Sequence, residues 1–566
     1  MLTPKFEYKA GALTVDGTGN FSRSKNDYET SSRGTIRAET LNTIPVDFVA
    51  TRSSAQSAEW TIVQTGGADW SNLANFTNPR ITEEGRFAYT EILSGEINAR
   101  YVTPWRLPTF FKFGGKWAEE NRETDNTTPY LLYSYVGPGG SILNPNGTVT
   151  AAGSFAAFPS PRAFNTDMGR IRALTISNLP KLANRSDLSQ LYREHPEYFV
   201  NTATPENYYS GYIANRRDFG QKVTASYGMA NTRIGRVQVQ GGLRWERTET
   251  MAKEFDPLTA AQVQAAGFPV SATTRRATTV PGLQYQYFSQ PRVTRKGEYD
   301  NFFPSVSAKY SFTPSLQVQA GYSHAIARPP IDALGGVWSI NDIAKIITAP
   351  NANLKPEVSD NYVARLAYYF EPVGSFTFLV QQIEISDQRI TRRATAEQFG
   401  YADDPEYADY EFETQLNNST LYRYRSAELG YSRQLTFLPG VLRNTNLNLS
   451  YTRNYANQYF PGVSPHKGTA SLGWSYKRLS LRVGGVWQDD TPFTTVFGRY
   501  QRHNIKLDLS GGVKVTSRVS MFFQGRNILN DPTLLYEGDP TRGIPAALYR
   551  YGNFGVSWSL GVRGNF

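Results

Sequence analysis

Cysteine is absent from the 566 residues, which excludes a disulfide framework, thiolate metal sites and a cysteine nucleophile. Long apolar runs are missing too. No stretch reaches the roughly 18 residues that a membrane-spanning helix needs, so the chain is not a helical membrane protein. Only 19% of the residues are charged and 13% are aromatic, a balance that excludes a disordered chain. The sequence therefore predicts a folded protein of another class.

Charge is modest but positive. The chain has 59 Lys and Arg against 49 Asp and Glu, which gives a net charge of +10. A nucleic-acid-binding protein usually concentrates such a charge on one face or one helix, whereas these basic residues are spread along the whole chain. We therefore expect no nucleic-acid partner and favour a solvated surface. Attraction to anionic lipid headgroups or to an anionic ligand is the alternative.

Alternation of apolar and polar residues is the dominant pattern. Over residues 554–566, apolar or small residues occupy every second position, and a strand separates such residues onto two faces whereas a helix scatters them. Globular strands are usually about 5 to 6 residues long, and tilted membrane-spanning strands about 9 to 11. The same alternation recurs at 237–245, 479–487 and 505–515. The pattern predicts a β-barrel.

Connection lengths support this prediction. From residue 206 onward, short links alternate with long polar excursions, which is typical of transmembrane barrels with short periplasmic turns and long extracellular loops. The long excursions lie near 123–205, 249–297, 328–357, 389–421, 490–502 and 530–547. We expect an all-β fold, a large antiparallel transmembrane β-barrel of about 18–22 strands whose extracellular loops carry short helices.

Two excursions contain helical signals. Asp256-Pro257 precedes an apolar stripe that ends at Gly267, and Ser186-Asp187 opens a segment with Leu188, Leu191 and Tyr192 on one side. Either helix could shape a ligand vestibule. The favoured interpretation is that each long loop packs on itself.

Five short segments stand out along the second part of the chain: GGLRWERT at 241–248, NFFPS at 301–305, YSHAIARP at 322–329, NANLKPE at 351–357 and GRNILN at 525–530. In this order they resemble the barrel signatures of TonB-dependent outer-membrane receptors, and the terminal aromatic residue fits the last strand of that family. The residues that carry the resemblance are Gly241, Leu243, Arg244, Arg328, Pro329, Asn351, Leu354, Lys355, Pro356, Glu357, Asn527 and Phe566.

This resemblance implies a barrel of about 22 strands whose lumen is closed by an N-terminal plug. Met1–Glu7 lacks a basic region followed by an apolar core, so no secretion signal is visible, and little room precedes the first predicted strands. We therefore expect residues 1–566 to be one receptor-like barrel domain from which truncation has removed the plug and the signal peptide. A plugless barrel acting as a passive outer-membrane channel is the alternative.

The resemblance also implies a role and partners. The expected function is active, TonB-dependent uptake of a scarce large solute, such as a siderophore, a cobalamin-like complex or an oligosaccharide, across the outer membrane of a Gram-negative bacterium. The expected partners are outer-membrane lipid and lipopolysaccharide, the TonB complex through the missing plug, and the solute. The protein is expected to be a monomer. A third hypothesis is a non-transport adhesin or assembly barrel.

Residues for catalysis or metal binding are scarce. The four histidines, His195, His324, His466 and His503, are far apart and lack metal-ligand spacing. Six carboxylates lie within residues 403–413, without the spacing of a calcium-binding loop, and a solvated acidic loop is the favoured interpretation. We predict no enzymatic activity, no metal site and no cofactor. His324, beside Arg328, is the one histidine worth checking near a rim.

Aromatic residues on the predicted loops are the candidates for ligand contact. A large polar solute is held by many weak polar and aromatic contacts, and Trp338, Tyr401 and Tyr410 lie on the excursions where it would arrive. These three residues are the predicted ligand-binding positions.

Overall fold

A computed structural model describes most of the chain. The described residues are 1–30, 35–55, 57, 59–76, 79–83, 85–126, 132–138, 161–163, 174–176, 181–183, 185–335, 339–341, 344–351, 353–398, 409–458, 460–493, 498–539 and 544–564.

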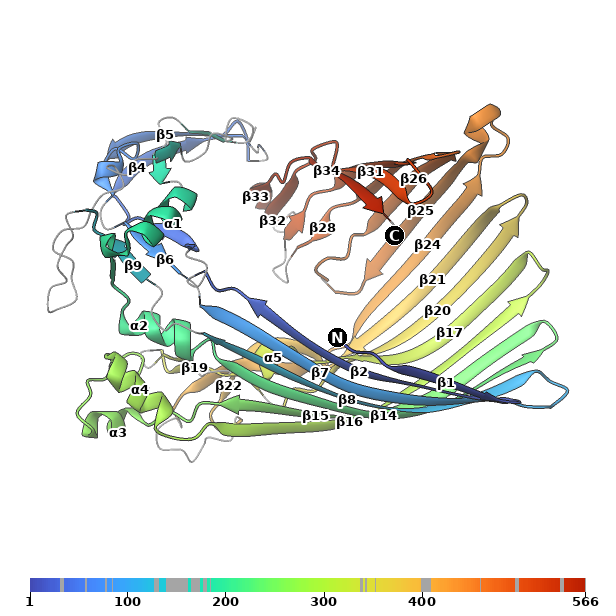
Figure 1. Cartoon of the computed structure of the whole chain (residues 1–566), viewed down its shortest axis with the longest axis horizontal. Helices are drawn as coiled ribbons and strands as arrows, with labels where there is room; N and C mark the ends of the chain where they lie inside the picture. The colour runs from blue at the N-terminus through green and yellow to red at the C-terminus, as the bar shows by residue number, and fades with distance from the viewer. Residues whose placement is uncertain are drawn as a thin grey trace.

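Seventeen antiparallel strands form the main sheet, and each strand pairs with the next one in the sheet along the chain. Hairpin turns join them at one end and excursions with helices α1 to α4 lie at the other (Figure 1). The strands are β1 (Lys5–Ala10), β2 (Leu13–Asp27), β7 (Arg86–Val102), β8 (Thr109–Asn126), β14 (Arg217–Ile234), β15 (Val237–Glu254), β16 (Val293–Ser311), β17 (Leu316–Ala327), β20 (Glu357–Phe370), β21 (Gly374–Ser386), β24 (Tyr422–Gln434), β25 (Thr445–Ala456), β26 (His466–Tyr476), β27 (Leu479–Gln488), β30 (Asn504–Lys514), β31 (Val519–Arg526) and β34 (Ser557–Gly564).

The predicted all-β antiparallel barrel architecture is confirmed. The sheet has 17 strands, against the 18–22 expected from the sequence, and within the described residues no pairing joins β1 to β34. The strands reach 18 residues in β14 and β15 and 19 in β16, well beyond globular strands. No helix among the described residues is long and apolar enough to cross a membrane.

The register of β15 and β16 distinguishes the two faces of the sheet. Leu243 pairs with Pro304 and Trp245 with Phe302, and the apolar face that they share is open, with Leu243 51% exposed. On β16 this face carries Phe302 and Tyr310, eight positions and about 27 Å apart, close to the roughly 25 Å of a lipid-facing belt. Beyond the belt, the same face of β15 carries the charged residue Arg247. We call this the outward face.

The opposite, inward face is polar. Asn98 on β7 donates to Asp16 on β2 at 2.9 Å, and Tyr227 on β14 donates its hydroxyl to Asn98 at 2.6 Å. Gly114 on β8 makes this network possible, because a Cβ there would lie 2.4 Å from the Tyr227 ring. The inward face is therefore built for hydrogen bonding rather than for contact with lipid.

Short elements fill the excursions. The helices are α1 (Arg185–Glu194), α2 (Pro205–Tyr208), α3 (Ala260–Ala265), α4 (Val280–Phe288) and α5 (Ile331–Leu334). The short strands form small sheets made of β3 (Ala38–Thr40), β4 (Val46–Thr51), β5 (Trp60–Gly67), β6 (Arg80–Thr82), β9 (Leu132–Tyr135), β10 (Pro161–Ala163), β11 (Leu174–Ile176), β12 (Lys181–Ala183), β13 (Phe199–Asn201), β18 (Ser339–Asn341), β19 (Ile346–Thr348), β22 (Gln388–Thr395), β23 (Glu411–Asn418), β28 (Thr491–Pro492), β29 (Arg499–Gln501), β32 (Thr533–Asp539) and β33 (Ile544–Gly552).

Both predicted loop helices are present, as α1 and α3. The predicted start of α3 at Asp256-Pro257 is wrong, because the helix begins at Ala260 behind Thr259. Thr259 and Gln262 form a reciprocal capping box, which satisfies two backbone N–H groups at once and so outcompetes the upstream proline signal.

Candidate functional site

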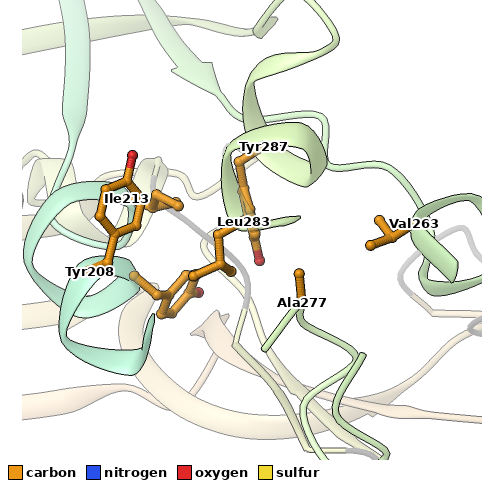
Figure 2. Packing of buried hydrophobic residues seen from close by; sticks show 7 residues of the cluster. Tyr208, Ile213, Val263, Ala277, Leu283 and Tyr287 are labelled. Carbon is orange, nitrogen blue, oxygen red and sulfur yellow. The ribbon is translucent and has the colours of Figure 1, made fainter. Parts of the chain in front are cut away.

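The loop-end modules are the first part of the candidate site. In the first module, α1 packs on the small sheet of β3, β6, β9 and β13, with Leu188 and Ile81 fully buried. In a second module, α2 and the π-helical turn at Tyr209–Ile213 pack against α4, which also contacts α3 (Figure 2). These clusters confirm that the long loops pack on themselves. The excursions therefore present surfaces of defined shape.

Charged side chains also stabilise the second module. Arg276 lies over the ring of Tyr209 at 3.9 Å and donates to the carboxylate of Glu206 at 2.8 Å. Figure 2 shows Tyr208 and Ile213 facing Leu283 and Tyr287 across the module. An arginine that stacks on an aromatic ring and pairs with a carboxylate fixes two elements at once.

A third module brings the excursions at 328–357 and 389–421 together. β19 pairs in parallel with β23. Ile347 and Phe412, both fully buried, pack with Tyr410 in the centre of this module. Lys345 lies 4.5 Å from the centre of the Tyr410 ring. Tyr410 is only 2% exposed, so its ring stabilises this module, and direct contact with a ligand stays a prediction.

The two other predicted ligand-binding residues, Trp338 and Tyr401, lie outside the described residues, as does Phe566. In the sequence, Trp338 immediately precedes β18, and Tyr401 belongs to the segment between β22 and β23. All three predicted aromatic positions therefore belong to the excursions that form the third module or border it.

Three signature motifs meet at an ion-pair network on the inward side. Arg244 Nη2 and Arg328 Nη2 lie 2.6 Å from the two carboxylate oxygens of Glu246. Glu246 is 12% exposed, and each arginine side chain is 31% exposed. The carboxylate thus joins β15 to the segment that follows β17, although the two are 82 residues apart.

Further contacts extend this network to β20 and β22. Arg389 donates to the backbone carbonyl of Arg328 at 2.9 Å, and its guanidinium lies 3.3 Å from the carboxylate of Glu357. The network therefore contains three arginines and two carboxylates, which leaves one positive charge in excess. It ties the excursion at 328–357 to the barrel wall at both of its ends.

The NANLKPE motif completes the attachment. Asn351 donates its side-chain amide to the carbonyl of Gln415 at 3.0 Å, and Asn417 both accepts from the backbone N–H of Lys355 and donates to its carbonyl, each at 2.9 Å. Leu354 is 3% exposed and packs against Phe219 and other residues on the inward face. The motif is therefore a structural clamp between the excursion and β23.

The other signature residues have separate positions. Gly241 and Leu243 lie on the outward face of β15, and Pro329 and Pro356 are buried at the two ends of the excursion. Asn527 follows β31 with a positive φ of 51° and accepts from the N–H of Asp531 at 3.1 Å, so it shapes a turn. These residues build the fold around the site.

A basic pocket of about 720 Å³ lies on the inward side near the hairpin-turn end of the last strands. It is lined by five cationic residues, Lys477, Arg478, Arg482, Lys514 and Arg563. Among the described residues, none of the five has a carboxylate within ion-pair distance. Uncompensated cations in a concave surface attract anions. The pocket is therefore suited to an anionic group.

His324 is the histidine that the sequence marked for checking. Its Nδ1 lies 2.9 Å from Asp360, which also accepts the Tyr322 hydroxyl at 2.7 Å. Tyr322 and Asp360 occupy outward-facing positions of β17 and β20, in register with the apolar belt. This trio faces away from the lumen and contains no serine or threonine nucleophile.

A half-buried acid makes the first module pH-sensitive. Burial raises the pKa of the Glu39 carboxyl from 4.5 to about 7, and Arg185 offsets part of this effect. The folded state thus binds this proton more tightly than the unfolded state, so stability falls as the pH rises from about 4.5 to about 7. Because the carboxyl is only half buried, solvent screening limits the loss to about 2 kcal/mol.

Replacing Glu39 with glutamine removes this penalty. We expect Glu39→Gln to protect the amides of α1 and β6 from hydrogen exchange at pH 7.5, by about 2 kcal/mol in local unfolding free energy, with little effect at pH 4.5. Glu197→Gln, at an exposed position of the same module but on another excursion, is the control. If Glu39→Gln protected these amides equally at both pH values, the raised pKa of Glu39 would be contradicted.

The sequence missed two parts of this site. Glu246 was visible inside the GGLRWERT segment, but nothing in the sequence linked it to Arg328. The basic pocket gathers residues from 477 to 563, and its only sequence signal was that arginine and lysine alternate with the outward apolar residues of those strands.

Comparisons with known proteins agree with this architecture. The model of the family "TonB dependent receptor-like, beta-barrel" matches residues 7–528. A search of curated protein sequences found no significant match.

Solved structures with a similar fold include the ferric-catecholate import receptor Fiu of Escherichia coli K12 (TM-score 0.53, 12% identity), the siderophore receptor PiuA of Acinetobacter baumannii (0.51, 14%) and the copper transporter OprC (0.52, 12%). These comparisons cover 100%, 99% and 100% of the chain, but the chain spans only 63%, 63% and 65% of the matched proteins. At such identities the similarity establishes the fold alone.

Proposed function

Since the chain belongs to the family of TonB-dependent receptor-like β-barrels, we propose that it forms the barrel of an outer-membrane receptor for TonB-dependent active uptake of a scarce, large solute. The observation that carries the proposal is the match to this family over residues 7–528. Members of the family are transporters and receptors of the outer membrane rather than enzymes.

The loop modules support a role in capture. A passive pore needs little ordered material outside the membrane, whereas three packed clusters hold the excursions of this chain in defined shapes. Defined surfaces lower the entropic cost of binding a large solute. The ion-pair network of Arg244, Glu246 and Arg328 holds one such surface, the excursion at 328–357, on the barrel wall.

The basic pocket favours an anionic solute. Of the three solute classes that the sequence left open, a metal–siderophore complex can be strongly anionic. The single phosphodiester charge of a cobalamin-like complex is balanced by its cobalt centre, and a neutral oligosaccharide gains nothing from five cations. We therefore propose that the solute is an anionic complex that passes Arg482 and Arg563 as it leaves the barrel toward the hairpin-turn end.

The coupling to TonB requires a plug. We propose that TonB acts through a plug segment outside residues 1–566, which fits the 63–65% of their length that the chain spans in similar solved proteins. The barrel would work as a monomer in contact with outer-membrane lipid and lipopolysaccharide.

Deletion of the gene tests the capture role. The mutant cells are expected to lose high-affinity uptake of one anionic complex from a panel of labelled siderophores, cobalamin-like compounds and oligosaccharides. In the complemented strain, Trp338→Ala and Tyr401→Ala should each weaken the apparent affinity about tenfold, because each removes an aromatic contact. Tyr410→Phe, which keeps the buried ring, should leave it unchanged.

The same uptake measurements can also contradict the proposal. Uptake that is normal for every solute after deletion would point to an adhesin or assembly barrel and overturn the proposal. Unchanged affinity in both alanine variants would remove these two residues from the binding surface, while leaving the receptor role to be judged from the deletion.

A further inference from the structure

A pocket of about 540 Å³ lies in the first module, between the start of α1 and the segment that joins β2 to β3. Three arginines line it, Arg37 from that segment and Arg185 and Arg193 from α1. The other described residues that line it are Thr30, Thr35, Ile36, Ser186 and Ser189. Hydroxyl groups thus accompany the arginines, and none of the described lining residues is acidic. Guanidinium and hydroxyl donors together are suited to an oxyanion.

Hydrogen bonds hold the walls of this pocket together. Ser189, which is 5% exposed, accepts from the backbone N–H of Ile36 at 3.3 Å and donates to the carbonyl of Arg185 at 2.8 Å. The Nη1 of Arg185 donates to the carbonyl of Arg37 at 3.3 Å, and the N–H of Arg37 donates to the carbonyl of Thr82 in β6 at 2.7 Å. The backbone that carries Arg37 and Arg185 is therefore fixed on both sides of the pocket.

Arg185 also acts on an acid that does not line the pocket. Glu39 lies on β3 opposite Ile81 of β6, whose side chain belongs to the core beneath α1 (Figure 1). The Oε2 atom of Glu39 is buried and has no hydrogen-bond partner among the described residues. Burial raises the pKa of this carboxyl, and the charge of Arg185 lowers it in part. One guanidinium thus serves both the pocket and Glu39.

Other ionisable groups belong to the same packed elements. They are Arg37 before β3, Arg80 and Glu83 on and after β6, Tyr133 and Tyr135 on β9, Asp187, Tyr192, Arg193 and Glu194 on α1, and His195, Glu197 and Tyr198 behind it. Glu83 interacts with the hydroxyls of Tyr133 and Tyr192, whereas Glu39 interacts with Arg185. Proton binding at Glu39 is therefore the event that changes the surroundings of a pocket arginine.

We propose that this pocket binds an oxyanion, a phosphate, sulfate or carboxylate group, and that Glu39 takes up a proton when the anion binds. An ionised Glu39 repels the anion and competes with it for Arg185, whereas a protonated Glu39 does neither. Because this coupling is reciprocal, the affinity is highest below the pKa of Glu39 and falls as the pH rises through about 7. The proposal does not depend on the transport role.

Isothermal titration calorimetry tests the site on the whole chain purified in mild detergent. Inorganic sulfate is the probe, because its charge is constant between pH 6 and pH 8.5. We expect sulfate to bind about tenfold more weakly at pH 8.5 than at pH 6, and buffers of different ionisation enthalpy should reveal proton uptake between these values. In Glu39→Gln the affinity should be the same at both pH values and close to that of the unmodified protein at pH 6.

The arginine variants separate the two roles of the pocket. Arg185→Gln should weaken binding about tenfold at pH 6 and abolish the pH dependence, whereas Arg193→Gln should weaken it as much and keep the pH dependence. Oxalate distinguishes the sources of the oxyanion. Tighter binding than that of sulfate would assign the pocket to the carboxylates of an organic ligand, and weaker binding to a free inorganic ion, and both results support the site.

Matched controls lie outside the pocket. Arg393→Gln removes an arginine of the third module that pairs with Glu413, and Glu197→Gln removes an exposed acid of the first module. Both should bind sulfate as the unmodified protein does. Failure of sulfate to bind at pH 6, a pH dependence that persists in Glu39→Gln, or an equal loss in Arg393→Gln would each overturn the proposal.

Discussion

Replacing Glu246 with alanine is expected to release the excursion at 328–357 from the barrel wall. The substitution leaves Arg244 and Arg328 side by side without their shared carboxylate, and removing one partner of a buried pair costs about 3–5 kcal/mol. Because both arginines are 31% exposed, solvent screens part of this cost, and we expect about 2–3 kcal/mol. The measurement is hydrogen exchange of the amides in 328–357, together with solute uptake.

A matched variant separates this effect from a general loss of charge. Glu249 lies three positions further along β15 on the outward face, where it pairs with Lys222 at 3.5 Å and is 44% exposed. Glu249→Ala should change the local free energy by less than about 0.5 kcal/mol. Unchanged exchange in Glu246→Ala, or equal changes in both variants, would show that the network does not hold the excursion.

Replacing Phe412 with alanine should unfold the third module locally. The ring is fully buried against Ile347, so the substitution removes a large apolar side chain and leaves a cavity, at a cost of about 4 kcal/mol. The amides of β19 and β23 should lose their protection from hydrogen exchange, and uptake should fall because the loop surface is lost. The main sheet should keep its protection, since this module lies outside it.

Neighbouring positions provide the control. Glu411 is exposed at the start of β23, so Glu411→Ala should change the protection by no more than about 0.5 kcal/mol. Tyr410→Phe keeps the buried ring and should behave in the same way. If Phe412→Ala left exchange in β19 and β23 unaltered, the cluster would not be the core of this module.

The barrel was predictable because a single physical rule, alternation at every second residue, holds along each long strand. The pairing of the strands in chain order follows from their short turns. The loop modules were less readable. Tyr410 and Phe412 alternate with acidic residues, which suggested a solvated tip, but the same alternation buries one face of β23. A period of two was therefore the signal there as well.

Contacts between distant segments were beyond the sequence. The motifs marked Arg244 and Arg328 as important without revealing that both bind Glu246, because the strand register and the path of the excursion decide which side chains meet. Neighbours on the outward face arise in the same way, because Ala364 and Ala427 come to flank Val380 only through the pairing of β20, β21 and β24.

We propose that transport through this barrel is energised. The most direct measurement is the initial rate of solute uptake by intact cells, before and after collapse of the proton-motive force and in cells with and without TonB. We expect uptake to fall at least about tenfold after the proton-motive force is collapsed or TonB is removed, while binding of the solute to the cells is unchanged. Uptake that continues at the same rate under both conditions would contradict it and identify the barrel as a passive channel.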